Sequence, residues 1–418
     1  MGENLVFLKG QPAGSTQPYF LSQIDQKLDD KTPLDKQQAR AAIDQQAAGT
    51  ANLIAEFIGA TKHRLDIAIY DFRLPDGTVH DTVVNAINGA AQKGIAVRIA
   101  YDKDQEEKTP GTIDYFLGAG SDPAPDGTNE FVESRKRFDK SIQRKGITTQ
   151  AIDPQHHIMH HKYILRDALT PQASVLMGSA NFTLDAWATQ ENNILVIDSA
   201  PDLVLMYAND FGEMWTSEKI GSTGVDDSGQ FTLDRHTQVQ VSFAPGRGTE
   251  VEGRIADSIA GATERVLIAS MVISSGKILR AISHAMTDVQ HFGGLYDAGA
   301  MAGVEHAWRR AKTASTSGSP KKAKLDAFSS AQKLAMWTEM KPILHAKHSI
   351  KYDDKLPHNF MHNKVAVADD TVITGSFNFS NNAMKNAENV LVIKNPALAD
   401  QYATYIETLL NRYGPSDH

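Results

Sequence analysis

Two histidine–lysine pairs lie about 200 residues apart in the sequence. The first pair is His160 and Lys162, and the second is His362 and Lys364, so a single residue separates the members of each pair. A neutral imidazole can attack a phosphorus atom or exchange a proton, and an ammonium group can neutralise the charge on phosphoryl oxygens. These residue types in this spacing therefore indicate chemistry on a phosphodiester.

The same polar residues follow the histidine–lysine pair in both copies. Each copy continues with an Asp, a Gly-Ser-x-Asn-Phe-Ser/Thr turn and a Glu ten residues after the Asn. Because chance repetition of this compound pattern is negligible, the chain contains an internal duplication. The Asp-to-Gly connection is five residues longer in the first copy, and the closing strand slips by one residue. The matched residues are Asp167 and Asp369, Ser179 and Ser376, Asn181 and Asn378, and Glu191 and Glu388.

Strand geometry predicts how each copy presents its side chains. Alternation along a strand places His160 and Lys162 on one face and His161 on the other, and the same parity pairs His362 with Lys364. If the two repeats pack face to face, both histidines reach one phosphorus atom. We then expect one imidazole to attack directly, forming a phosphohistidine, and the other to protonate the leaving oxygen.

The remaining motif residues are assigned supporting roles. A Gly-Ser turn lets backbone and hydroxyl approach an oxyanion, and an Asn amide adds a donor. A Glu can orient a histidine through its second ring nitrogen. No metal or cofactor is needed for this chemistry. The predicted phosphate ligands are Lys162, Lys364, Ser179, Ser376, Asn181 and Asn378; the predicted orienting residues are Glu191 and Glu388; Asp167 and Asp369 are predicted to be structural.

Each motif follows a segment that reads as a βαβ unit. Apolar, β-branched runs flank a helical stretch in both copies, which predicts the α/β class. We expect two pseudo-symmetric α/β/α lobes, each with a mixed, mostly parallel sheet flanked by helices, and the active site between them. The first copy has runs at 64–72 and 95–102 around a helix at about 79–93, and the second has runs at 265–273 and 292–297 around a helix near 277–287.

At 418 residues the chain exceeds what one hydrophobic core usually organises. The first 35 residues have no strong pattern and are interpreted as an irregular arm. A basic stretch at 308–324 is interpreted as a solvated loop; the alternative is a flap whose cations meet a phosphate-bearing substrate. The predicted divisions are an N-terminal arm and helix at 1–49, a first lobe at 50–215, a linker at 216–235 and a second lobe at 236–418.

Composition excludes several classes of site. Lys plus Arg total 42 against 50 Asp plus Glu, a net charge of −8 that does not favour non-specific binding to a polyanion. The absence of cysteine excludes disulfides, thiolate nucleophiles and zinc–thiolate sites. Histidines at 156, 157 and 161 do not predict a metal site, because neighbouring strand residues point to opposite faces. With no signal peptide or apolar run of roughly 20 residues, a cytoplasmic protein is expected.

The duplicated motif is the HKD signature, and the chain resembles the phospholipase D superfamily over nearly all of both lobes. The segments at 243–270 and 292–308 also resemble the family. This resemblance implies a phosphohistidine mechanism, metal independence and one paired active site. Many members use the histidine of the first copy as nucleophile, so we expect His160 to attack and His362 to act as the acid. The motif residues themselves do not distinguish the nucleophile from the acid.

Two substrate classes remain open at this point. The favoured function is a hydrolase that releases the head group of a glycerophospholipid, with exchange to an alcohol as a second outcome and peripheral contact with a membrane. The alternative is a metal-independent endonuclease acting on DNA or RNA, which the turn motifs and the basic stretch support. A binding protein descended from such enzymes and a lipid-to-lipid transferase are disfavoured, because the motifs are complete and no transmembrane segment is seen. We expect a monomer, since both half-sites lie in one chain.

Overall fold

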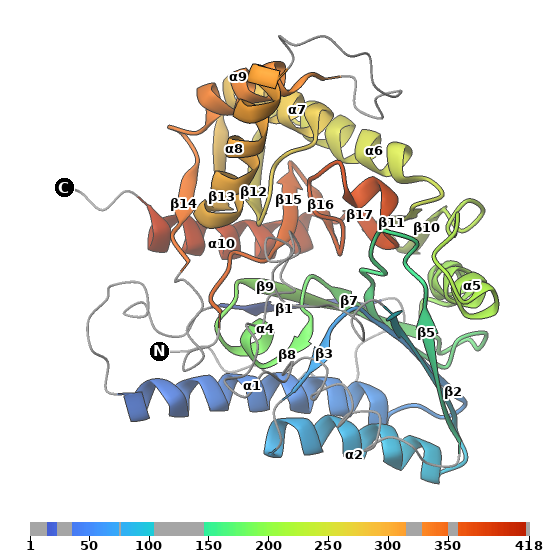
Figure 1. Ribbon diagram of the computed structural model, residues 1–418. Coiled ribbons are helices and arrows are strands. Elements are labelled where there is room, and N and C mark those ends of the chain that lie inside the picture. The colour runs from blue at the N-terminus through green and yellow to red at the C-terminus, as the bar shows by residue number, and fades with distance from the viewer. Residues whose placement is uncertain are drawn as a thin grey trace.

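A computed structural model describes residues 15–22, 36–74, 77–103, 146–314, 328–349 and 358–414. Two β-sheets face each other, and helices cover their outer sides (Figure 1). The predicted basic stretch is described only to residue 314, where it forms the end of a helix; positions 315–324 lie outside the described residues.

The first sheet has seven strands in the order β1-β9-β7-β6-β2-β4-β5. Its central strands are apolar on both faces because both faces are covered. A two-stranded parallel pair, β3 (Phe72–Arg73) and β8 (Phe182–Thr183), lies beside it. The strands of the sheet are β1 (Thr16–Leu21), β2 (Arg64–Ile69), β4 (Ala96–Asp102), β5 (Ile147–Ile152), β6 (Lys162–Arg166), β7 (Ser174–Gly178) and β9 (Asn192–Ile197).

The second sheet has eight strands in the order β10-β11-β17-β16-β15-β12-β13-β14. From β11 onward this order repeats that of the first sheet strand for strand, with β10 added at the edge. The duplication read from the motifs therefore extends to the whole sheet. The strands are β10 (Gly229–Asp234), β11 (Thr237–Ala244), β12 (Arg265–Ser270), β13 (His291–Asp297), β14 (His345–Lys347), β15 (Lys364–Ala368), β16 (Thr371–Gly375) and β17 (Glu388–Lys394).

Helices cover the outer faces and also fill the space between the sheets. Apolar residues at helical spacing form the buried side of each outer helix, as Val83, Val84 and Ile87 do in α2. The α7 helix begins where the Ser275 side chain accepts a hydrogen bond from the Ile278 amide. The helices are α1 (Lys36–Gly59), α2 (Thr78–Gln92), α4 (Leu184–Ala188), α5 (Pro201–Ser217), α6 (Gly248–Ala260), α7 (Gly276–Asp288), α8 (Ala298–Ala314), α9 (Ser330–Met340) and α10 (Pro396–Tyr413), with a 3-10 turn η4 (Ala383–Lys385).

The predicted α/β architecture with two lobes is confirmed, and both sheets are mixed. The expectation that parallel pairs predominate is corrected. Within the two large sheets, parallel pairing is confined to β2–β4–β5 and β12–β13–β14, where helical or long connections join the strands. The motif strands pair antiparallel, because loops as short as that between β15 and β16 can join only antiparallel neighbours.

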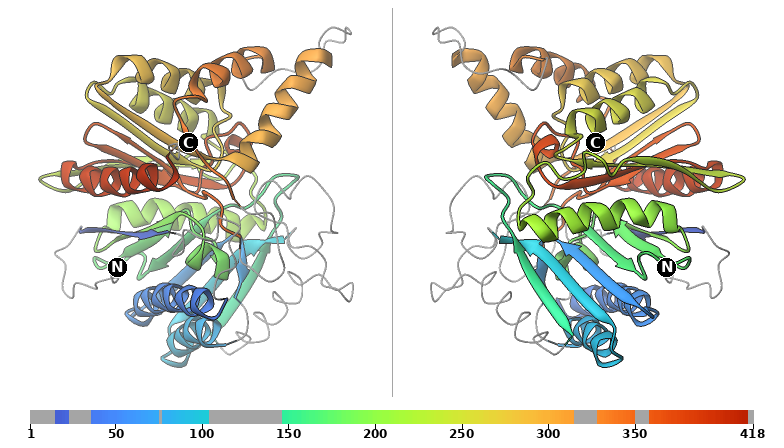
Figure 2. Two further views of the ribbon diagram at one scale, coloured as in Figure 1. Left: turned by 90° about the vertical axis from the view of Figure 1, so that its left-hand side faces the viewer. Right: turned by 90° about the vertical axis from the view of Figure 1, so that its right-hand side faces the viewer.

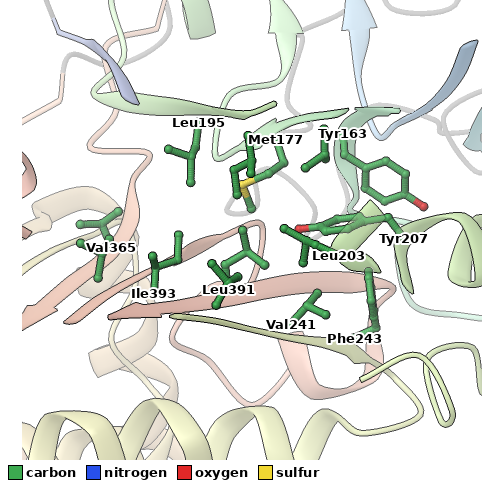
Figure 3. Close-up of a cluster of buried hydrophobic side chains, with 14 of the residues drawn as sticks. Tyr163, Met177, Leu195, Leu203, Tyr207, Val241, Phe243, Val365, Leu391 and Ile393 are labelled. Atoms are coloured by element: carbon green, nitrogen blue, oxygen red, sulfur yellow. The ribbon is translucent and has the colours of Figure 1, made fainter. Parts of the chain in front are cut away.

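The core has three parts rather than one for each lobe. Outer clusters lie under α1 and α2 and under α6 to α9. The third cluster lies between the sheets, where α5 and α10 run (Figure 2). There Met177 and Leu195 of the first lobe face Leu391 and Ile393 of the second (Figure 3). A shared apolar core therefore holds the lobes together.

Two segments assigned outside the lobes form sheet edges. Within the predicted irregular arm, β1 pairs antiparallel with β9, and Tyr19 and Leu21 are buried. The strand was overlooked because it is short and contains Pro18, which an edge strand tolerates. Within the predicted linker, β10 pairs with β11. The α1 helix crosses the boundary predicted at residue 50 and packs against the first sheet.

Candidate active site

The two motifs meet where the lobes touch. The segments just before β6 and β15 cross between lobes, so that Met159 bridges to Ala387 and Met361 to Glu191. The His160 amide donates to Ala387 O at 2.9 Å, and the His362 amide donates to Glu191 O at 3.0 Å. Backbone hydrogen bonds thus fix each histidine against the opposite lobe.

The two histidine rings have different partners across the lobe boundary. Nδ1 of His160 lies 2.8 Å from Oε2 and 2.9 Å from Oε1 of Glu388. Nδ1 of His362 lies 3.0 Å from Oδ1 of Asn192. Each ring donates its Nδ1 proton to such an oxygen, which leaves Nε2 as the nitrogen for chemistry. A carboxylate therefore orients one histidine and an amide the other.

The prediction for Glu191 is corrected. The sheet pairings set Gly178 opposite Ile194 and Gly375 opposite Val390, so Asn192, not Glu191, occupies the place of Glu388. Successive residues of an extended chain point to opposite sides, and the slip turns the carboxylate away from the histidine. Glu191 Oε1 instead lies 3.2 Å from Lys347 Nζ, and both side chains are buried.

Each lysine lies beside its own histidine, as the strand parity predicts. Lys162 Nζ donates to His160 O at 2.7 Å, and Lys364 Nζ donates to His362 O at 2.6 Å. All four side chains are at most 2% exposed. The charge of each lysine lowers the pKa of both histidines, so the four groups form one electrostatic unit.

The Gly-Ser-x-Asn turns approach the opposing strand closely. A Cβ on Gly178 would lie 2.2 Å from Asn193 O, so only glycine fits there. Ser179 Oγ donates to Asn192 Oδ1 at 2.8 Å, so this hydroxyl holds the orienting amide; its binding to phosphate stays a prediction. The Oδ1 atoms of Asn181 and Asn378 are buried without a hydrogen-bond partner among the described residues, and the binding of phosphate by these two amides stays a prediction.

Burial sets the protonation of the site. Desolvation, and then the two lysine charges, hold the pKa of His160 and His362 well below the usual value. Desolvation likewise lowers the pKa of Lys162 to about 7, opposed by the carboxylates of Glu388, Asp71 and Asp102. The pKa of Lys364 is also well below its usual value, because of burial and then the charge of Lys162.

Glu388 carries the complementary shift. Burial raises the pKa of this carboxyl to about 8, while Lys162 and hydrogen bonds from Ser376 and Asn386 act in the opposite direction. Its closest contact is the ring of His160. The carboxyl group of Glu388 therefore faces Nδ1 of His160, and Nε2 is the ring nitrogen left to attack.

The HKD aspartates lie at the far ends of the motif strands. Asp167 accepts hydrogen bonds from the amides of Lys62, His63 and Arg64. Asp369 accepts from the amides of residues 263, 264 and 265 in the same way. Each carboxylate thus ties a motif strand to the loop that begins the neighbouring strand.

The sequence alone assigned no role to Asp102, Asp297 or Tyr70. Asp102 Oδ2 accepts from the Met159 amide at 2.7 Å, and Asp297 Oδ2 accepts from the Met361 amide at 3.2 Å. A Tyr-Asp pair at the end of both β4 and β13 was the available signal. Tyr70 packs edge-on against the His160 ring and lies under Lys162 Nζ at 5.2 Å.

The described residues contain neither a metal-binding cluster nor a membrane-spanning helix. No group of three or more His, Cys, Asp or Glu side chains there could hold a metal ion. His161 points away from His160, and its Nε2 lies 3.1 Å from Asp210 Oδ2. No helix in the same part of the chain combines the length and apolarity needed to cross a membrane.

Comparison with known proteins agrees with this geometry. The family model described as cardiolipin synthase, PLD-like domain, matches residues 54–215 and 255–410. Mitochondrial cardiolipin hydrolase of Chlamydomonas reinhardtii is 26% identical over 160 residues, which are 38% of this chain and 55% of that protein. Phospholipase D of Rickettsia conorii is 46% identical over 74 residues, 16% of this chain and 35% of that protein. The matches thus span about half or less of these curated relatives.

A solved structure shares the fold over most of the chain. The phosphatidylserine synthase of Haemophilus influenzae superposes with a TM-score of 0.55 at 11% sequence identity. The match covers 88% of this chain and 85% of that one. At this identity the likeness concerns the fold alone.

Proposed function

The chain belongs to the family described as cardiolipin synthase, PLD-like domain, and on this premise we propose that it is a phosphodiesterase that acts on glycerophospholipids. The observation that carries the proposal is the convergence of two buried histidines and two buried lysines from two repeats. Two ammonium groups can neutralise a phosphodiester, and two imidazoles can serve as nucleophile and acid. A single chain then holds the complete site.

The first step forms a covalent intermediate. Nε2 of His160 attacks phosphorus as the bond to the leaving oxygen breaks, and Nε2 of His362 gives that oxygen a proton. The low pKa of His160 keeps this ring neutral and ready to attack. Burial and then the two lysine charges lower the pKa of His362; a bound anion offsets those charges and thereby favours the protonated ring in the complex.

The second step releases the product. His362, now neutral, takes a proton from water as the water oxygen attacks phosphorus. The nitrogen–phosphorus bond breaks, and its electron pair returns to His160. An alcohol can replace water, which yields a new phosphodiester instead of a phosphomonoester.

The choice of lipid as substrate rests on the relatives. The matched family model is described as a cardiolipin synthase domain, and the two curated relatives are called a cardiolipin hydrolase and a phospholipase D. The acidic balance of the chain also disfavours a substrate that carries many phosphates, since a polyanion is held by basic surfaces. We therefore propose a phospholipid ahead of a nucleic acid.

A transfer assay tests this proposal. The purified protein is incubated in EDTA with vesicles of phosphatidylcholine, phosphatidylethanolamine and cardiolipin in the presence of ethanol, with His160→Ala as the control. We expect ethanol-exchanged phospholipid from the wild type and none from the variant, because a phosphohistidine can be resolved by alcohol. Absence of both exchange and hydrolysis would overturn the lipid proposal, and cleavage of DNA or RNA in the same buffer would support a nuclease instead.

A further inference from the structure

The surroundings of Glu388 suit a negatively charged group. Its Oε1 accepts from Asn386 Nδ2 at 3.1 Å, and both its oxygens lie within 2.9 Å of His160 Nδ1. The hydroxyl of Ser376 is a further hydrogen-bond partner. Each of these neighbours can donate a hydrogen bond to the carboxylate. A carboxylate can therefore accept bonds through both its oxygens at this position.

The surroundings of Asn192 suit a neutral amide instead. Its Oδ1 accepts from Ser179 Oγ at 2.8 Å and faces His362 Nδ1 at 3.0 Å. Its Nδ2 donates to Ala186 O at 3.1 Å and to Gln190 Oε1 at 3.3 Å. A carboxylate here would turn its second oxygen toward two acceptor oxygens. The surroundings therefore favour a side chain with one donor end and one acceptor end, which an amide provides.

The nearby carboxylate of Glu191 does not restore the missing charge. Its side chain points to the opposite side of the extended backbone, where Oε1 lies 3.2 Å from Lys347 Nζ. Tyr413 also donates a hydrogen bond to it. Its charge is thus matched by a buried cation on the side away from His362.

We infer that Asn192 is the positioning residue of His362, and that its neutrality commits His362 to the acid role and His160 to the nucleophile role. This inference rests on the proposed phosphodiesterase function. Phosphorylation of Nε2 leaves a positive imidazole ring, which a carboxylate at Nδ1 stabilises and an amide does not. A general acid must give up its proton. An imidazolium that faces only an amide does so more readily than one that faces a carboxylate.

Leaving-group dependence tests the inference. The probes are methyl p-nitrophenyl phosphate, whose leaving group departs without protonation, and methyl phenyl phosphate, whose leaving group needs an acid. We expect Asn192→Ala to lower kcat/KM, which reports the step that expels the leaving group, about 100-fold for the phenyl ester, the usual contribution of a general acid, and less than about 10-fold for the p-nitrophenyl ester. A purely structural defect would lower both rates equally.

Glu388→Ala is the matched control, because Glu388 holds the equivalent position in the other half-site. Removal of the carboxylate that contacts His160 should slow the hydrolysis of both esters by a similar factor. Equal losses for Asn192→Ala, or a larger loss for the phenyl ester in Glu388→Ala, would overturn the inference. If the wild type hydrolyses neither ester, the proposed function fails.

A spectroscopic measurement on the wild type separates the two failures, because it does not depend on turnover. Nitrogen-15 labelled histidine reports which ring nitrogen bears the proton, and the His362 signal is identified by its loss in His362→Ala. The inference expects the proton on Nδ1 of His362, facing Asn192. A proton on Nε2 with Nδ1 bare would overturn the positioning role whatever the activity.

Discussion

In the first half of the site a carboxylate, Glu388, accepts the proton of the histidine ring, whereas in the second half an amide, Asn192, does so. The backbone around the two rings is otherwise alike: each histidine amide donates to the opposite lobe at the same point of the repeat. A one-residue slip of one strand thus changed the charge behind one histidine and left its position intact. Duplicated half-sites can diverge in chemistry while the fold stays symmetric.

Removal of either histidine should have the largest effect on activity. Because the two rings serve one phosphorus atom, we expect His160→Ala and His362→Ala each to lower kcat by at least about 1000-fold. Steady-state turnover of vesicle lipid measures this. Substantial activity in either variant would mean that each lobe works alone, and recovery on mixing the two variants would mean that sites form between chains.

The sequence predicted the motif strands, the βαβ units and the pairing of His160 and Lys162, because alternation and β-branched runs are local properties of the chain. It did not predict which acidic residue meets which histidine. Counting residues equates Glu191 with Glu388, but strand register decides the partner, and register is set by pairing across the sheet. The edge strand β1 was missed because it is short and contains Pro18, and because its partner β9 lies far away in sequence.

The second prediction compares Glu388, which the strand register places beside His160, with Glu191, which matches Glu388 only by its spacing in the sequence. We expect Glu388→Gln to lower kcat on the order of 100-fold, because the ring of His160 loses the charge that stabilises its positive form. Glu191→Gln should change kcat less than about 10-fold but lower the free energy of unfolding by about 3–5 kcal/mol, since Lys347 would face a neutral amide in the core. Paired kinetic and thermal-unfolding measurements check this, and similar kinetic losses in both variants would contradict it.

The third prediction concerns Asp71, whose counterpart in the second lobe is the apolar Val272. Burial lowers the pKa of Lys162 to about 7, and the Asp71 charge opposes this. Lys162 is thus charged below that pH and neutral above it, so the inhibition constant of dimethyl phosphate, whose charge is constant, should rise as pH increases through about 7.

Asp71→Asn should move that rise in the inhibition constant to lower pH, because removing a neighbouring negative charge lowers the pKa of Lys162 further. The exposed Asp81→Asn is the matched control and should leave the profile in place. An unchanged profile in Asp71→Asn would show that another group sets phosphate binding.

The smallest change in kcat is expected for Asp167 and Asp369, which make equivalent contacts in the two lobes. Replacing either with Ala leaves loop amides without their acceptor, and we expect a loss of about 1–3 kcal/mol in the free energy of unfolding. Chemical denaturation measures that loss, and kcat per folded molecule should change little. A loss of kcat without loss of stability would place these aspartates in the chemistry instead.

Detection of the phosphoryl group on the enzyme shows directly whether His160 and His362 serve one site. Wild-type protein and His362→Ala are mixed with methyl p-nitrophenyl phosphate and quenched in alkali, which preserves phosphohistidine, and their peptides are analysed by mass spectrometry. A single site with His160 as nucleophile predicts methyl phosphate on the His160 peptide, in larger amount in His362→Ala because water attack lacks its base. Modification of His362 in the wild type, or of neither histidine while substrate is turned over, would contradict this mechanism.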